Sequence, residues 1–233
     1  MGRTNSWKGA LQRAPFLSSG KIYFVNKRSL TYLCILMRTR DENKICELHR
    51  RTVEMIVKDG LDGFGVNKLA KAAGVSPATI YIYYKDREDL IVQTAIRVTE
   101  RMLKESLEGF DPDNMSLEEG LRNQWQNRAR HFFNNPLDTQ FMEKMRYSHL
   151  YDKVSKDVYN TFKEMMGRFC RNAIKRGELI PLSTEVYWSL AYAPLYQLIK
   201  FHSQDKTFGD KKFVFTEEAM EEALQLVLKA LKP

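Results

Sequence analysis

The sequence lacks the paired cysteines that a disulfide framework or a zinc ribbon requires. Its three cysteines, Cys34, Cys46 and Cys170, are odd in number and widely spaced, which excludes both arrangements. The four histidines are scattered as well, without the close helical spacing of zinc ligands. We therefore expect no metal site, and the unpaired thiols fit a reducing, cytoplasmic setting.

Long apolar runs and catalytic motifs are also missing. No stretch of about 18 apolar residues occurs, so the sequence predicts no transmembrane helix and no membrane partner. No P-loop, dinucleotide fingerprint or set of nucleophile and base is visible. These absences argue against an enzyme, and they predict no cofactor and no catalytic residue.

The chain does have an excess of positive charge. Among its 233 residues, 37 Lys and Arg face 29 Asp and Glu, for a net charge of +8. Such a balance favours an anionic partner, which is usually nucleic acid or an anionic membrane surface, although it can also serve solubility alone. The hydrophobic share of 43% is ordinary for a globular protein and allows one large or two modest domains.

The first 36 residues stand apart, because they hold six basic residues and no acidic one. Three interpretations compete: a disordered basic arm that adds non-specific affinity for DNA, an extra structured element, or upstream sequence translated from a wrong start. We favour the last interpretation, with Met37 as the true start, because helical patterning is recognisable only after that residue.

From Asp41 onward, apolar residues recur at three- and four-residue steps, the period of helices that face a core. No pair of strands is visible, so the sequence predicts an all-α fold. Pro194 is expected to kink the penultimate helix. The expected helices span about 41–59, 66–73, 76–84, 86–107, 116–133, 137–149, 153–176, 183–202 and 216–231.

Two of these short helices, joined through Gly74, have the pattern of a helix-turn-helix. Glycine permits the left-handed backbone that the turn needs. Ser76 is placed to cap the second helix, and Pro77 takes its first position, as that terminus prefers. Such a second helix presents its N-terminal side chains to the major groove of double-stranded DNA.

The four-residue spacing of Ile80 and Tyr84 places both on one face, which we expect to be the core face. Tyr81, Ile82 and Tyr83 then point elsewhere. An outward isoleucine suits contact with a thymine methyl group, and tyrosine hydroxyls and nearby lysines suit phosphates. The alternative is that these aromatic and apolar residues form a small core of their own.

The run from Leu69 to Leu90 resembles the TetR/AcrR family of bacterial repressors, which has the pattern I-A-x-x-A-G-V-S-x-x-x-L-Y-x-H/Y-F-x-x-K-E-x-L there. The likeness covers about residues 41–91. Two departures are Gly65, in place of the usual Ser or Thr cap, and Tyr84, in place of the usual Phe. Together the spacing and the resemblance give as candidate DNA-binding residues Lys68, Ser76, Pro77, Ala78, Thr79, Tyr81, Ile82, Tyr83, Lys85 and Arg87.

The resemblance further implies a three-helix DNA-binding domain at 37–90 and a helical domain at 91–233 for ligand binding and dimerisation. It implies a ligand-responsive repressor that binds a palindromic operator as a homodimer. The two apolar C-terminal helices suit either a dimer interface or a core. A pocket for a lipophilic or aromatic small molecule, with an ordinary helical core as the alternative, would use Trp125, Phe133, Phe141, Met145, Phe162, Met166 and Tyr192.

Two questions stay open. A non-regulatory, architectural protein would also bind DNA, but with little sequence preference and no response to small molecules. An activator would carry the same motif as a repressor.

Overall fold

The structure is a computed structural model that describes residues 30–154, 156–204 and 212–233; of residues 30–40 and 204 it describes the backbone only. Within these ranges every regular element is a helix and none is a strand, which confirms the predicted all-α class. No helix in this part of the chain combines the length and apolarity needed to cross a lipid bilayer. The chain divides into residues 1–42 and 43–233, and the packing below is that of the second unit.

The first helix, α1, spans Leu30–Gly63 and so begins before the expected start at Asp41. The greater part of the basic N-terminal segment, residues 1–29, lies outside the described residues. Gly60 interrupts α1 with φ 77° and ψ 172°, a backbone conformation that glycine adopts without steric cost. The break therefore falls where the sequence predicts it, although one further helical turn follows.

Three helices follow α1 and pack with it: α2 (Val66–Ala73), α3 (Pro77–Tyr83) and α4 (Arg87–Ser106). Asp86 caps α4, since its side chain accepts a hydrogen bond from the Asp89 amide at 2.8 Å, as predicted. We call the buried apolar cluster that joins these helices the N-terminal core. It comprises Leu48, Val53, Ile56, Phe64, Val66, Leu69, Ala70, Ile80, Tyr84, Leu90, Ile91, Val92, Ala95, Val98, Phe141, Met145, Leu150 and Val154.

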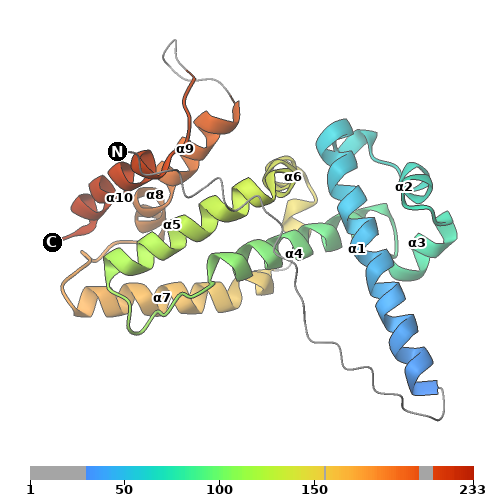
Figure 1. Cartoon of the computed structure of the whole chain (residues 1–233), viewed down its shortest axis with the longest axis horizontal. Coiled ribbons are helices and arrows are strands. Elements are labelled where there is room, and N and C mark those ends of the chain that lie inside the picture. The colour runs from blue at the N-terminus through green and yellow to red at the C-terminus, as the bar shows by residue number, and fades with distance from the viewer. Residues whose placement is uncertain (1–29, 155, 205–211) are drawn as a thin grey trace, which may run out of the picture. The chain divides into compact units, whose positions relative to one another are not determined.

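The remaining helices form a bundle with the second half of α4, in which α5 packs against α4, α6, α7, α9 and α10 (Figure 1). They are α5 (Leu117–Asn134), α6 (Pro136–Arg146), α7 (Asn160–Lys175), α8 (Thr184–Ala191), α9 (Ala193–Gln204) and α10 (Glu217–Leu231). Two short 3₁₀ helices, η2 (Tyr151–Lys153) and η3 (Lys156–Tyr159), precede α7.

Two expected boundaries were wrong. The expected helix over 153–176 begins only at Asn160, because the chain before it forms 3₁₀ turns. The expected helix over 183–202 is two helices rather than one kinked helix. Tyr192 leaves the helical conformation at φ −125°, and Pro194 has no amide hydrogen with which to continue the backbone ladder of α8.

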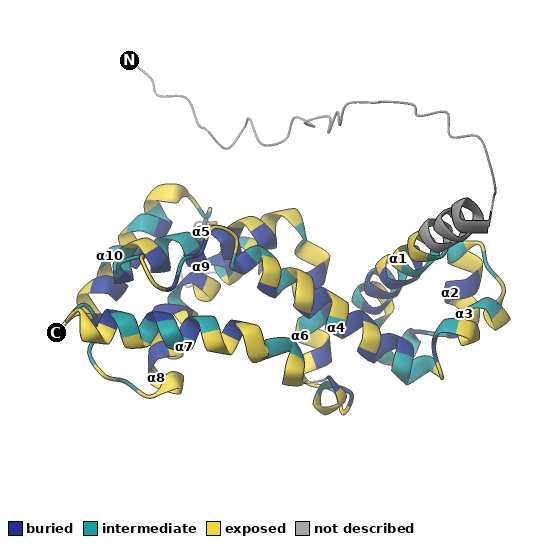
Figure 2. Ribbon diagram, turned by 90° about the horizontal axis from the view of Figure 1, so that it is seen from below, coloured by how far each residue is buried: buried dark blue, intermediate teal, exposed yellow. Residues whose placement is uncertain are grey.

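Buried residues line the inward faces of the bundle helices (Figure 2). α4 serves both clusters, because Val98 lies in the N-terminal core and Leu103 in the bundle, so packing is continuous past residue 90. The cluster of the bundle, here the C-terminal core, comprises Leu103, Phe110, Leu117, Leu121, Trp125, Ala129, Phe162, Met166, Phe169, Ala173, Leu179, Tyr187, Ala191, Tyr192, Leu195, Ile199, Met220, Leu224, Val227, Leu228 and Leu231.

Candidate nucleic-acid interface and ligand site

The turn between α2 and α3 depends on Gly74. Its φ of 66° lies in the left-handed region, and its amide closes α2 by donating to the Ala70 and Lys71 carbonyls. The next amide, of Val75, also donates to the Ala70 carbonyl, at 3.0 Å. A residue with a Cβ would strain this turn. The turn therefore fixes the direction in which α3 leaves α2.

The N-terminus of α3 is capped as the sequence predicts. The Ser76 hydroxyl accepts a hydrogen bond from the Thr79 amide at 3.1 Å, and the two side-chain oxygens lie 2.9 Å apart. Pro77 takes the first helical position, where no amide hydrogen is needed. Because α3 has only seven residues, this cap and the packing of Ile80 hold it in place.

One face of α3 is buried and the other is open, as predicted. Ile80 and Tyr84 are 1% and 6% exposed, whereas Tyr81 is 53% and Ile82 is 77% exposed. Pro77 and Ala78 are exposed, and Thr79 and Tyr83 are half-buried. An apolar side chain that protrudes this far has no core to pack against, so the face suits contact with another surface such as a base edge.

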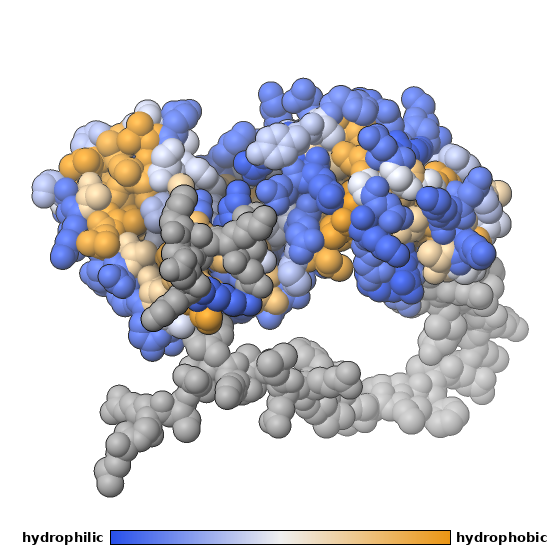
Figure 3. All heavy atoms as spheres, turned by 90° about the horizontal axis from the view of Figure 1, so that it is seen from above, coloured by the Kyte–Doolittle hydropathy of each residue, from blue (hydrophilic) through white to orange (hydrophobic). Residues whose placement is uncertain are grey.

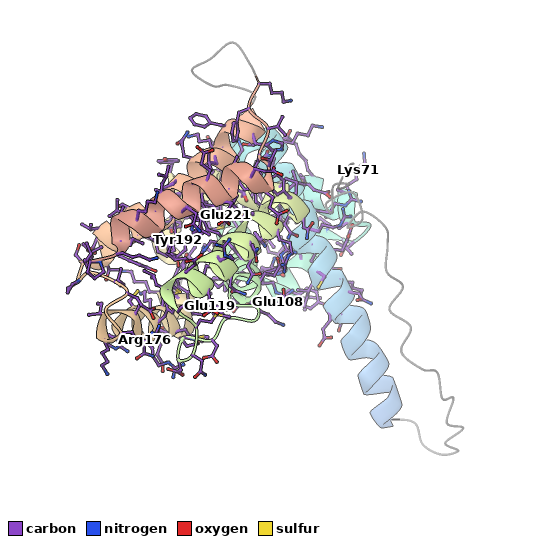
Figure 4. The ribbon with its side chains drawn as sticks, turned by 60° about the vertical axis from the view of Figure 1, so that its left-hand side comes forward. Lys71, Glu108, Glu119, Arg176, Tyr192 and Glu221 are labelled. Atoms are coloured by element: carbon purple, nitrogen blue, oxygen red, sulfur yellow. The ribbon has the colours of Figure 1, made fainter. Side chains whose placement is uncertain are left out.

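Three lysines flank this face. Lys68 and Lys85, both candidates from the sequence, are exposed; Lys68 Nζ also donates to the Gly63 carbonyl at 3.3 Å. Lys71 is exposed on α2 and was not among the candidates (Figure 4). Its position in the last turn of α2, beside the turn to α3, was the signal that could have identified it. Together the lysines give the helix-turn-helix positive charge for phosphate groups.

Arg87, the remaining candidate, is already engaged within the protein. Its Nε donates to the Phe64 carbonyl at 3.0 Å, and its Nη2 donates to the Leu61 carbonyl. The guanidinium carbon lies 5.7 Å from the centroid of the Phe64 ring. Arg87 thus ties the start of α4 to the connection between α1 and α2. Its contact with DNA stays a prediction.

A buried polar chain links the helices behind α3. The Tyr84 hydroxyl lies 2.9 Å from His49 Nε2, His49 Nδ1 lies 2.7 Å from Thr94 Oγ1, and Thr94 donates to the Leu90 carbonyl at 2.7 Å. Since Thr94 has one hydroxyl proton, His49 donates through Nδ1 and accepts from Tyr84 through Nε2. The tyrosine that departs from the family pattern therefore ties the end of α3 to α1 and α4.

Burial sets the charge of this polar chain. Desolvation, with a smaller contribution from the nearby positive charge of Arg97, lowers the pKa of His49 to about 4. Desolvation also raises the pKa of Tyr84 to about 12. At neutral pH both side chains are uncharged, which is the state that the single hydrogen-bond pattern requires.

The seven predicted pocket residues do not come together. Trp125, Phe162, Met166 and Tyr192 lie in the C-terminal core, and Figure 4 labels Tyr192 among its helices. By contrast, Phe141 and Met145 belong to the N-terminal core, because α6 packs on α4 there. Phe133 is 38% exposed and lies beside His202 and Phe215. The structure therefore distributes the seven residues over three places rather than around one cavity, and their contact with a ligand stays a prediction.

One of these residues, Phe162, also lines an open groove. It has a volume of about 950 Å³ and runs between the end of α4 and the start of α7. Leu103, Phe162 and Met165 contribute to its apolar lining. Within the bundle, Trp125 Nε1 donates to the Ala191 carbonyl at 2.7 Å, which ties α5 to the end of α8.

The sequence prediction also missed Arg128. This arginine of α5 is only 5% exposed, and three aromatic rings surround its guanidinium. Its spacing of seven from Leu121 and three from Trp125 places it on the buried stripe of α5, a signal available in the sequence.

Comparison with known proteins agrees with these features. Residues 49–94 match the family model of bacterial regulatory proteins of the tetR family. An uncharacterized HTH-type transcriptional regulator of Haemophilus influenzae is 25% identical over 186 residues, which are 80% of this chain and 94% of that protein. A fatty acid metabolism regulator protein of Bacillus subtilis is 39% identical over 49 residues, 21% of this chain and 25% of its own length.

Solved structures share the fold over most of the chain. A TetR family transcription regulator from Marinobacter aquaeolei has a TM-score of 0.68 and 27% identity, covering 84% of this chain and 98% of its own. The regulator FadR from Bacillus subtilis, solved with stearoyl-CoA, has a TM-score of 0.64 and 17% identity, covering 80% and 98%. The fold and the helix-turn-helix define an all-helical DNA-binding regulator. Residues 49–94 thus carry a DNA-binding domain of the tetR family type, and the chain as a whole is similar in fold to a TetR family transcription regulator.

Proposed function

We propose that the protein is a ligand-responsive repressor that binds a palindromic operator as a homodimer. The observation that carries this proposal is the open face of α3, where Tyr81 and Ile82 protrude from a helix that is otherwise fixed by its cap and its core contacts. A recognition helix needs this combination, because base contacts require outward side chains on a rigid support.

A homodimer is supported by apolar side chains that the chain itself leaves uncovered. They lie on the C-terminal helices, where Figure 3 shows an apolar area of the surface. The apolar stripe of α10 does not serve this purpose, since Met220, Leu224 and Leu228 face the C-terminal core. The side chains available for a self-complementary interface are Val186, Trp188, Leu190, Tyr196 and Leu226, which are 37% to 60% exposed.

Regulation by a ligand is supported by α4 and by the FadR relative, whose structure contains stearoyl-CoA. Since α4 contributes to both cores, a ligand that shifts its second half also shifts the packing behind α3. Such a ligand acts by favouring a dimer geometry in which the two copies of α3 no longer fit their half-sites.

The test is protection of the promoter next to the protein's own gene, together with binding to that DNA and to random DNA at one salt concentration. A repressor is expected to protect an inverted repeat and to prefer it by about a thousandfold or more. Equal affinity for both DNAs would instead favour the architectural alternative.

A further inference from the structure

Arg128 is a buried cation, only 5% exposed. Among the described residues no carboxylate forms an ion pair with it. Its Nη1 donates to the Tyr196 hydroxyl at 2.7 Å and its Nη2 to Gln124 Oε1 at 3.2 Å, while the buried Nε has no acceptor. Burying a charge is strongly unfavourable unless an opposite charge compensates it. The site is therefore short of one negative charge.

The surroundings of Arg128 offer more donors but no anion. The guanidinium carbon lies 4.6 Å from the ring centroid of Tyr192 and 5.3 Å from that of Trp188. The hydroxyls of Tyr187 and Tyr192 are buried and interact with each other, and Tyr187 also interacts with Cys170, although none of these contacts has full hydrogen-bond geometry. Burial raises the pKa of both, so each keeps its proton and can donate it. Arg128 and these hydroxyls form what we call the Arg128 cluster.

Phe162 connects this cluster to the groove between α4 and α7. Its ring centroid lies 5.4 Å from the Arg128 guanidinium carbon, and the same residue lines the groove. Two acids of the groove rim already have partners, since Glu105 pairs with His131 at 2.7 Å and Glu108 with Arg130 at 3.3 Å. Phe162 is thus the side chain that contacts both the groove and Arg128, and a ligand with its apolar body in the groove would reach Arg128 only if this ring turned aside.

We propose that the effector is an organic carboxylate with an apolar body, and that its carboxylate binds the Arg128 cluster. The planar guanidinium matches the two oxygens of a carboxylate, and a single negative charge balances a single arginine, which favours a carboxylate over a dianionic phosphate. This proposal rests on the ligand-responsive part of the proposed function, and it names the ligand class.

The test measures binding to the full-length protein without DNA. The probes are octanoate, decanoate, dodecanoate and 2-naphthoate, each beside its alcohol of the same body. Binding is followed by thermal shift and by tryptophan fluorescence, because Trp188 lies against Arg128. We expect at least one acid to bind about 10- to 100-fold more tightly than its alcohol, as loss of a charge-assisted pair predicts.

Two variants and a control assign that preference to Arg128. Arg128→Met should abolish the preference for acid over alcohol, and Arg128→Lys should weaken it because an ammonium lacks the planar fork. Arg171→Met is the control, since Arg171 is exposed on α7 and does not line the groove. If Arg128→Met fails to fold, the wild type and Arg128→Lys still provide the comparison.

Three results would overturn the proposal: no acid binds, the alcohols bind as tightly as the acids, or the folded Arg128→Met variant keeps the preference. Release of operator DNA is measured separately. Acids that bind through Arg128 without changing DNA affinity would support a carboxylate site at the Arg128 cluster but refute its role in ligand-responsive repression. A neutral compound that releases DNA from both the wild type and Arg128→Met would support ligand-responsive repression and refute the carboxylate inference.

Discussion

Replacing Tyr84 with phenylalanine removes one hydroxyl from the interior and leaves the shape of the ring unchanged. The hydroxyl lies 2.9 Å from His49 Nε2, and the two residues are 6% and 7% exposed. Without it, His49 Nε2 loses its donor in a largely buried site. A buried polar atom left without a partner costs about 1–3 kcal/mol. The family usually carries phenylalanine here, but the histidine of this chain makes the hydroxyl necessary.

The assay is urea unfolding at pH 7, where His49, with a pKa of about 4, is neutral. Tyr84→Phe should lower the free energy of unfolding by about 1–3 kcal/mol. The control is Tyr81→Phe, which removes the same atom from a side chain that is 53% exposed and should change stability by less than about 0.5 kcal/mol. If both variants are as stable as the parent, the buried polar chain does not stabilise the helix-turn-helix.

Three further predictions concern packing, pH and salt. Gly120→Ala should lower the free energy of unfolding in urea by about 1–3 kcal/mol, because the new Cβ overlaps the fully buried Phe169 ring. An unchanged unfolding midpoint would show that the Phe169 ring moves aside at no cost. The folded pKa of His49 lies below its unfolded value of 6.5, so its contribution is complete above pH 6.5 and about 3 kcal/mol is lost by pH 4. A His49→Gln variant should lose less stability over that range, and an equal loss would contradict the assignment. Lys85→Ala should weaken binding to all DNA. The slope of the logarithm of the binding constant against the logarithm of the salt concentration should fall in magnitude by about 0.9 for each phosphate that the lysine neutralises. An unchanged slope would argue against a contact between Lys85 and the phosphates.

The helix-turn-helix could be predicted because its determinants are local. Gly74 in the turn and Ser76 and Pro77 at the start of α3 act within a few residues of their positions, and the structure confirms each of them. The four-residue spacing of Ile80 and Tyr84 likewise determines which side of α3 faces the core.

The grouping of the candidate pocket residues could not be predicted, because it depends on which helices meet. Phe141 and Phe162 are similar aromatic residues in the sequence, yet α6 carries the first into the N-terminal core and α7 the second into the C-terminal core. The contacts of Arg87 with the Phe64 and Leu61 carbonyls could not be predicted for the same reason, because these partners lie more than 20 residues away in the sequence; its contact with DNA stays a prediction.

Arg128 shows why a correct helical pattern can be overlooked. Its spacing from Leu121 and Trp125 places it on the inner stripe of α5, but arginine is rarely buried, so the pattern alone does not single it out. A charged residue on an apolar stripe is the sequence signal for a buried ionic site, although the sequence does not say whether another side chain or a ligand supplies the counter-ion.

The central claim is that the open face of α3 contacts base edges. Its most direct test is selection of binding sites from random DNA by the wild type and by Thr79→Ala and Ile82→Ala. The account predicts that each substitution changes the preferred base at defined, symmetric positions of an inverted repeat while the fold is retained. If both variants select the same sequence as the parent, another surface of the protein recognises the operator.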